Sequence, residues 1–110
     1  MKIYITLDYE LFFGSQSGGI DDCIINPTNE LIKIADPHQV KIVFFVDVGY
    51  IDKLNEFKEK YPELQEDYKK ITSQIKSLSE NGHGIELHIH PHWENTIYDG
   101  EKWVFNTTQY

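Results

Sequence analysis

Arginine is absent from this sequence, and basic residues as a whole are few. Lysine and arginine together number 10, against 18 aspartate and glutamate residues, and the formal net charge is −8. A protein that binds nucleic acid normally carries clustered basic side chains that neutralise backbone phosphates. The sequence has no such cluster, so we expect no nucleic-acid partner. A neutral ligand, or one held with the help of a bound cation, is the better match.

Cysteine and long apolar runs are also scarce. The one cysteine, Cys23, cannot form a disulfide within the chain, and we expect a reducing, cytoplasmic environment. No segment approaches the roughly 18 consecutive apolar residues of a membrane-spanning helix, so no membrane partner is expected. Asp8 and Glu10 interrupt the apolar N-terminal residues too early for a secretion signal. With 110 residues, the chain has the size of one domain.

Three segments have the pattern of β-strands. Residues 2–8 alternate with β-branched and aromatic side chains, and residues 84–90 alternate again until Pro91. Residues 41–48 are almost continuously apolar, which is typical of a strand buried on both faces of a parallel sheet. Residues 11–26 are rich in Gly, Ser and Asp and predict a loop.

Helices are predicted between these strands. Asn26-Pro27 has the form of an N-cap with proline at the first helical position, and predicts a short helix to about Ala35. Between residues 62 and 81, apolar side chains recur at steps of three and four, which predicts an amphipathic helix. Asp99-Gly100 suggests a turn between two short strands. The alternation of strands and helices predicts an α/β fold with a parallel sheet and right-handed crossovers.

Two groups of chemically active side chains follow predicted strands. Asp8 and Glu10 come at the end of the first strand, and His88, His90 and His92 at the end of the third. Because ligands bind where the carboxyl ends of parallel strands meet, we expect the two groups to lie together. Imidazole and carboxylate are the usual ligands of catalytic zinc. The sequence therefore predicts a divalent-metal site for zinc, with cobalt, nickel or manganese as alternatives.

The residues alone leave the choice of histidine ligands open. His88 and His90 are two apart and share one face of a strand. A turn at Pro91 would instead bring His92 back towards His88. There is also an alternative without a metal. The histidines would then be hydrogen-bonded loop residues, and Asp8 and Glu10 would be solvated side chains at the end of a strand.

Three segments resemble motifs of the NodB-type polysaccharide deacetylase family. Residues 6–10, Thr-Leu-Asp-Tyr-Glu, resemble the family's Thr-Phe-Asp-Asp motif, and residues 41–46 resemble its Ala-Thr-Phe-Phe-Val strand. Residues 82–92 resemble its Gly-His-Glu-Ile-Gly-Asn-His-x-x-x-His segment, and all three come in the family's order. The resemblance implies that residues 1–110 are the N-terminal portion of one such domain. The expected fold is an incomplete (β/α) barrel of the polysaccharide deacetylase type, with about three β/α units and parallel strands.

The same resemblance implies a role for each residue of the two groups. Asp8 corresponds to the catalytic general base, and Glu10, His88 and His92 correspond to the metal ligands. Tyr9 stands where the family usually has its second aspartate. His90 is extra to the motif, and we expect it, with Trp93, to support the ligands or to face the substrate.

The implied activity is metal-dependent removal of N-acetyl groups from a sugar or polysaccharide precursor. Two alternatives stay open: another metal-dependent amidohydrolase that uses His88 and His90, and a non-catalytic, truncated metal-binding domain. Some aromatic side chains are candidates either to stack on sugar rings or to belong to the core: Phe12, Phe13, Trp93 and Trp103. The open edge of a partial parallel sheet is prone to self-association, so a homo-oligomer that covers this edge is also expected.

Overall fold

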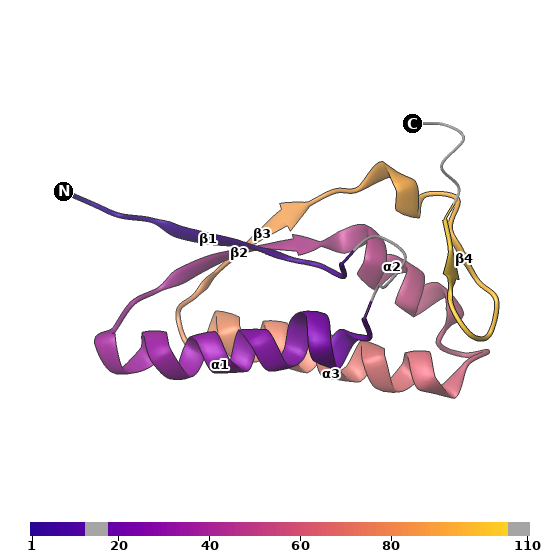
Figure 1. The fold of residues 1–110 in the computed structure, drawn as a ribbon, viewed down its shortest axis with the longest axis horizontal. Helices are drawn as coiled ribbons and strands as arrows, with labels where there is room; N and C mark the ends of the chain where they lie inside the picture. Colours follow the sequence, from indigo (N-terminus) through magenta and orange to yellow (C-terminus); the bar gives the residue numbers. More distant parts are fainter. Residues whose placement is uncertain (13–17, 106–110) are drawn as a thin grey trace.

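The computed structural model describes residues 1–12 and 18–105, in which a three-stranded parallel sheet is the central feature (Figure 1). Its strands, in spatial order, are β1 (Ile5–Tyr9), β2 (Ile42–Asp47) and β3 (Gly84–His88). The helices are α1 (Asn26–Ala35), α2 (Val48–Phe57) and α3 (Pro62–Glu80). The shorter elements are the hairpin strands β4 (Ile97–Tyr98) and β5 (Trp103–Val104) and the helical turns η1 (Asp21–Ile25), η2 (Asp36–His38) and η3 (Pro91–Trp93).

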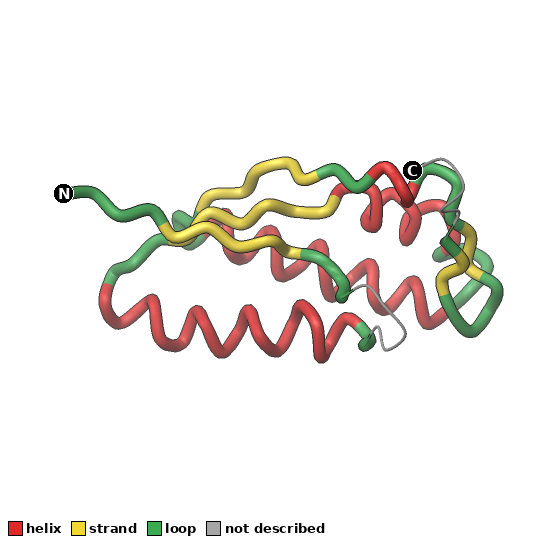
Figure 2. Tube along the Cα trace, turned by 45° about the horizontal axis from the view of Figure 1, so that its top comes forward, coloured by secondary structure: helices red, strands yellow, loops and turns green. Residues whose placement is uncertain are grey.

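Helices cover one face of the sheet. Figure 2 shows α1 and α3 running along the same side of the strands, while α2 continues from the end of β2. Alternation along β2 therefore buries Ile42, Phe44 and Val46 beneath the helices, whereas Val43 and Phe45 on the opposite face are only half-buried. The predicted α/β class with parallel strands is confirmed. Within the described ranges, the sheet has three strands and does not close into a barrel.

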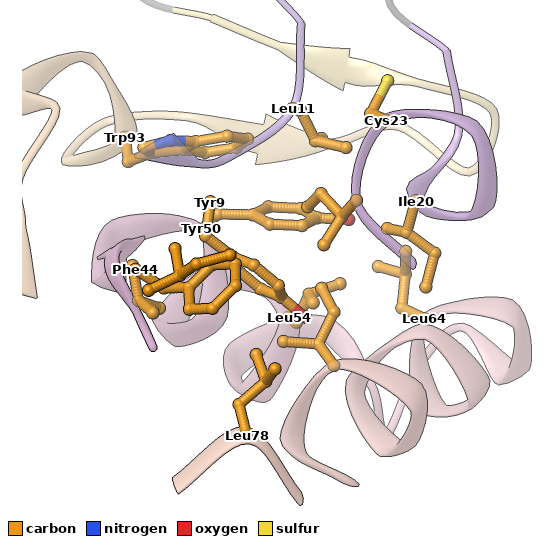
Figure 3. Packing of buried hydrophobic residues seen from close by; sticks show 14 of the residues in the cluster. Tyr9, Leu11, Ile20, Cys23, Phe44, Tyr50, Leu54, Leu64, Leu78 and Trp93 are labelled. Atoms are coloured by element: carbon orange, nitrogen blue, oxygen red, sulfur yellow. The ribbon is translucent and has the colours of Figure 1, made fainter. Parts of the chain in front are cut away.

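The core lies between the sheet and the helices (Figure 3). The amphipathic pattern predicted over residues 62–81 is confirmed by α3, which buries Leu64, Ile71 and Leu78. A polar contact also crosses this layer, because the Tyr9 hydroxyl donates a 2.6 Å hydrogen bond to Oε1 of Gln74 on α3. The Gln74 amide in turn donates to the backbone oxygen of Ile25, at 3.0 Å. Burial raises the pKa of Tyr9, so the hydroxyl stays a donor and holds the end of β1 against α3.

The loop predicted over residues 11–26 is wrong for its last third. Residues 21–25 form η1, a π-helical turn that runs directly into α1, and the Asn26 amide donates to the Asp21 carbonyl. The helix predicted from Asn26-Pro27 to about Ala35 is confirmed by α1. Asn26 is not its N-cap, however, because the helical backbone of η1 already precedes it. The physical reason is the burial of Ile20, Cys23 and Ile24, whose helical spacing outweighs the turn-forming residues around them. Residues 13–17 of the predicted loop lie outside the described residues.

Two further differences concern the strands' carboxyl ends. No helix was predicted over Val48–Phe57, yet α2 forms there and buries Tyr50 and Leu54. The third strand was predicted to reach residue 90 but ends at His88, because its partner β2 ends at Asp47, which pairs with His88. The predicted turn at Asp99-Gly100 is confirmed between β4 and β5.

The edges of the sheet carry exposed apolar side chains. Ile5 and Leu7 on β1 are 41 and 36% exposed, and Leu87 on β3 is 72% exposed. A homo-oligomer that covers such an edge was expected because an open sheet edge is prone to self-association, and it stays a prediction. Among the described residues, no helix combines the length and apolar character needed to cross a membrane.

His83, which directly precedes β3, has a structural role. The residue is buried, its Nδ1 accepts a 3.1 Å hydrogen bond from the Ile42 amide, and its Nε2 lies 3.3 Å from Oδ1 of Asp36. The ring therefore joins the starts of β2 and β3 to η2. These contacts lie at the amino ends of the strands, whereas the predicted metal site lies at their carboxyl ends.

We expect His83→Ala to lower the free energy of unfolding by about 1–3 kcal/mol, because the buried Ile42 amide loses its acceptor. Urea denaturation measures this change. His38→Ala is the matched control, since His38 is exposed on η2 and its loss should change stability by no more than about 0.5 kcal/mol. Equal effects of the two substitutions would contradict the bridging role.

Candidate metal centre

Three side chains converge beyond the carboxyl ends of the outer strands. Glu10 directly follows β1, His88 ends β3, and His90 lies two residues further along. Nε2 of His88 is 3.1 Å from Oε2 of Glu10, and Nε2 of His90 contacts the same carboxylate oxygen. The two imidazole rings stand at 89° with centroids 4.4 Å apart. One ligand atom from each of the three residues lies within 4.8 Å of the others.

The chemistry and spacing of these atoms fit a divalent ion. Nε2 of His88 is buried and has no hydrogen-bond partner among the described residues, although a carboxylate oxygen is close by. In a tetrahedral site with bonds of about 2.1 Å, neighbouring ligand atoms are roughly 3.4 Å apart. The 3.1 Å separation between His88 and Glu10 is near this value. The three side chains are 22–29% exposed, so the group lies close to the surface, although Nε2 of His88 itself is buried.

His92, which the family motif implied as a ligand, lies beside this group and outside it. Its ring packs on three neighbours with centroids 5.1–5.2 Å away: His90, Trp93 and Phe105. Burial lowers the pKa of His92 and His90 lowers it further, against the opposing effect of Glu10. The ring is therefore neutral near pH 7. The turn η3 directs His92 towards the aromatic core. His90 therefore takes the place beside Glu10 that was expected of His92.

Asp8, the residue implied as general base, lies on β1 two residues before Glu10. In the register of the sheet Asp8 pairs with Phe45, and Phe45 pairs with Glu86. Residues two apart on a strand share a face, so Asp8 is on the same face as Asp47 and His88. This is the face that the helices leave uncovered (Figure 2). The Asp8 side chain is exposed.

Asp47, at the carboxyl end of the central strand, is a residue that the sequence reasoning missed. It ends β2 in register with His88 and is only 1% exposed. Its Oδ2 accepts a 2.6 Å hydrogen bond from the indole Nε1–H of Trp93, while Oδ1 is buried without a hydrogen-bond partner in the described part of the chain. Burial raises the pKa of Asp47, and the Trp93 hydrogen bond and His90 act against this rise. The sequence feature that could have identified Asp47 is a carboxylate at the end of a buried strand. The same feature selected Asp8.

Trp93 is placed to support the site from within the core. Its indole is 1% exposed and packs against three aromatic rings at centroid distances of 5.0–5.4 Å: Tyr50, Trp103 and Phe105. A sugar ring has no access to a face buried in this way. Of the other aromatic candidates, Phe12 is 60% exposed and Trp103 is half-buried, and Phe13 lies outside the described residues.

Comparison of the chain with models of known protein families, with curated proteins and with solved structures gave no significant match. The geometry of the site and the motifs in the sequence are therefore the basis for a functional proposal.

The Trp93 indole leaves no room for a side chain at Gly49 in the first turn of α2. A Cβ atom at this position would lie 2.9 Å from Cβ of Trp93 and 3.0 Å from its Cδ1. We expect Gly49→Ala to lower the free energy of unfolding by about 1–3 kcal/mol through overpacking. The matched control is Gly19→Ala, because no atom lies within 4 Å of a Cβ built there. Denaturation curves that rank Gly49→Ala as stable as the control would contradict the close packing.

Proposed function

We propose that the chain binds a divalent metal ion through Glu10, His88 and His90, and that this ion serves a hydrolase of the polysaccharide deacetylase type. The observation that carries the proposal is the convergence of two imidazoles on one carboxylate oxygen at the end of a parallel sheet. Zinc is the expected ion, with cobalt, nickel and manganese as alternatives, because this set of ligands accepts all four.

The architecture supports the choice of family. In (β/α) barrels the active site lies at the carboxyl ends of the parallel strands, and all the residues of this centre lie at that edge. We propose that the uncovered face of the sheet corresponds to the interior of an incomplete barrel. Asp8 is on this face, two residues before Glu10, as a base that acts on a substrate in the barrel would be.

The proposed reaction is hydrolysis of the N-acetyl group of a sugar or a polysaccharide precursor. When bound, the ion would supply a Lewis acid for the amide carbonyl and would lower the pKa of a water molecule to about 7. Glu10, His88 and His90 would hold the ion, and the Asp8 carboxylate would accept the proton of the attacking water. An open depression of about 400 Å³ borders His90 and is lined also by polar side chains that could bind sugar hydroxyls: Asp52, Lys53 and Glu94.

A second candidate function is supported by the choice of histidines. The family's motif uses two histidines four residues apart, whereas Glu10 is approached here by His88 and His90, which are two apart. A pair with this spacing suits another metal-dependent amidohydrolase. The two candidates, and a domain that binds metal without turnover, differ in which histidine the ion requires and in whether acetate is released.

Single histidine substitutions separate these ligand sets. We expect His88→Ala and His90→Ala each to reduce zinc after dialysis from about one ion per chain towards none, because each removes one of three ligands. His92→Ala should keep its zinc, and His38→Ala is a control for the loss of an imidazole elsewhere. Metal content is measured by inductively coupled plasma mass spectrometry.

Full zinc content in His88→Ala would refute the proposed site. Loss of zinc in His92→Ala, together with its retention in His90→Ala, would restore the ligand pair that the family motif implies.

Asp8→Asn tests the base separately from the metal. Asparagine cannot accept the proton, so we expect normal zinc content and a loss of acetate release by about 10²–10⁴-fold. Acetate release from N-acetylglucosamine oligomers is the measurement, and Asp22→Asn, at an exposed position on η1, is the matched control. An Asp8→Asn protein that releases acetate at the rate of the unaltered chain would exclude Asp8 as the base.

A further inference from the structure

We propose that Asp47 is a positioning residue of the metal centre, which acts through Trp93 to hold His90 against Glu10 and His88. The inference rests on the proposed metal site and adds to it a residue from the central strand. Its basis is a continuous series of contacts from the end of β2 to the backbone of His90.

The first contact is the buried hydrogen bond between Asp47 and Trp93. Asp47 is the residue before α2. Its carboxylate accepts the Trp93 indole N–H at 2.6 Å, with both residues 1% exposed. Burying a carboxylate is costly unless it is hydrogen-bonded, so a residue that served packing alone would be apolar here. The carboxylate therefore fixes the indole in one orientation.

The second contact joins Trp93 to the ligand. The backbone amide of Trp93 donates a 3.1 Å hydrogen bond to the carbonyl oxygen of His90, across the η3 turn. Pro91 stands between them and restricts the backbone of the turn through its ring. Once the indole is fixed, the carbonyl of His90 is fixed too.

The far end of the segment is also held. The Thr96 hydroxyl donates a 2.6 Å hydrogen bond to the carbonyl oxygen of His92, and the Thr96 amide donates to that of Trp93 at 3.2 Å. His88 is held at the near end by its pairing with Asp47 in the sheet. Asp47 thus determines the position of both histidines: His88 by strand pairing and His90 through the indole. Only the second effect depends on its side chain.

Cobalt(II) titration of the metal-free full chain, followed by visible absorption, tests this role. We expect Asp47→Ala to weaken cobalt binding by about 10–100-fold, as loss of a group that supports a metal ligand typically does, and to change the absorption spectrum. Asp47→Asn should stay within a few-fold of the unaltered chain, because its amide oxygen still accepts from the indole. Leu78→Ala is the control for lost stability, since this buried residue near the end of α3 precedes β3 at the opposite edge of the sheet.

A second variant covers a failure of Asp47→Ala to fold. Trp93→Phe keeps a ring in the core but removes the indole donor, so it should weaken cobalt binding in the same range. A metal-free readout is the Trp93 indole N–H signal in nitrogen-15 NMR, identified by comparison with Trp103→Phe. That signal should shift and exchange faster with solvent in Asp47→Ala, and remain protected in Asp47→Asn.

Each outcome bears on a different claim. Unchanged cobalt affinity in Asp47→Ala, or in Trp93→Phe, would overturn the positioning role and leave the metal site intact. Equal weakening in Leu78→Ala would also overturn it, because general destabilisation would then account for the effect. Absence of cobalt binding by the unaltered chain would overturn the metal site itself, and the positioning role with it.

Discussion

The pairing of β2 with a parallel strand on each side is the interaction on which the rest of the structure depends. Tyr9 is in register with Val46, and Val46 with Leu87, so the next residue of each strand reaches the same level. Glu10, Asp47 and His88 are those residues. A slip of one residue in either pairing would turn the side chains of that strand to the opposite face and separate the group.

Much of the fold could be predicted from local patterns, because burial imposes a period on the sequence. The apolar run at residues 41–48 predicted the strand β2, and the steps of three and four predicted α3. The strand was expected to be buried on both faces, but Val43 and Phe45 on the uncovered face are only half-buried. The helices η1 and α2 were not predicted. Turn-forming residues precede η1 and a strand pattern runs into α2, so each helix depends on packing that only the assembled layers provide.

The site was predicted in part, and the missing part has a physical explanation. The rule that ligands gather at the carboxyl ends of parallel strands selected Glu10 and His88, which the structure brings together. The choice between His90 and His92 depends on the η3 turn, and that turn depends on where Trp93 is buried. Asp47 followed the same rule as the other acids, but its significance appears only with the indole that it binds.

The contact between Glu10 and His90 joins residues 80 positions apart in the chain. It connects segments that follow β1 and β3, the two outer strands, which are each paired with β2 and not with one another. An ion held between them would link the two outer strands at their carboxyl ends. An ion that binds the folded chain and not the unfolded chain stabilises the fold, so it would be a part of the protein's framework as well as of its chemistry. Withdrawal of the ion would then loosen both outer strands together.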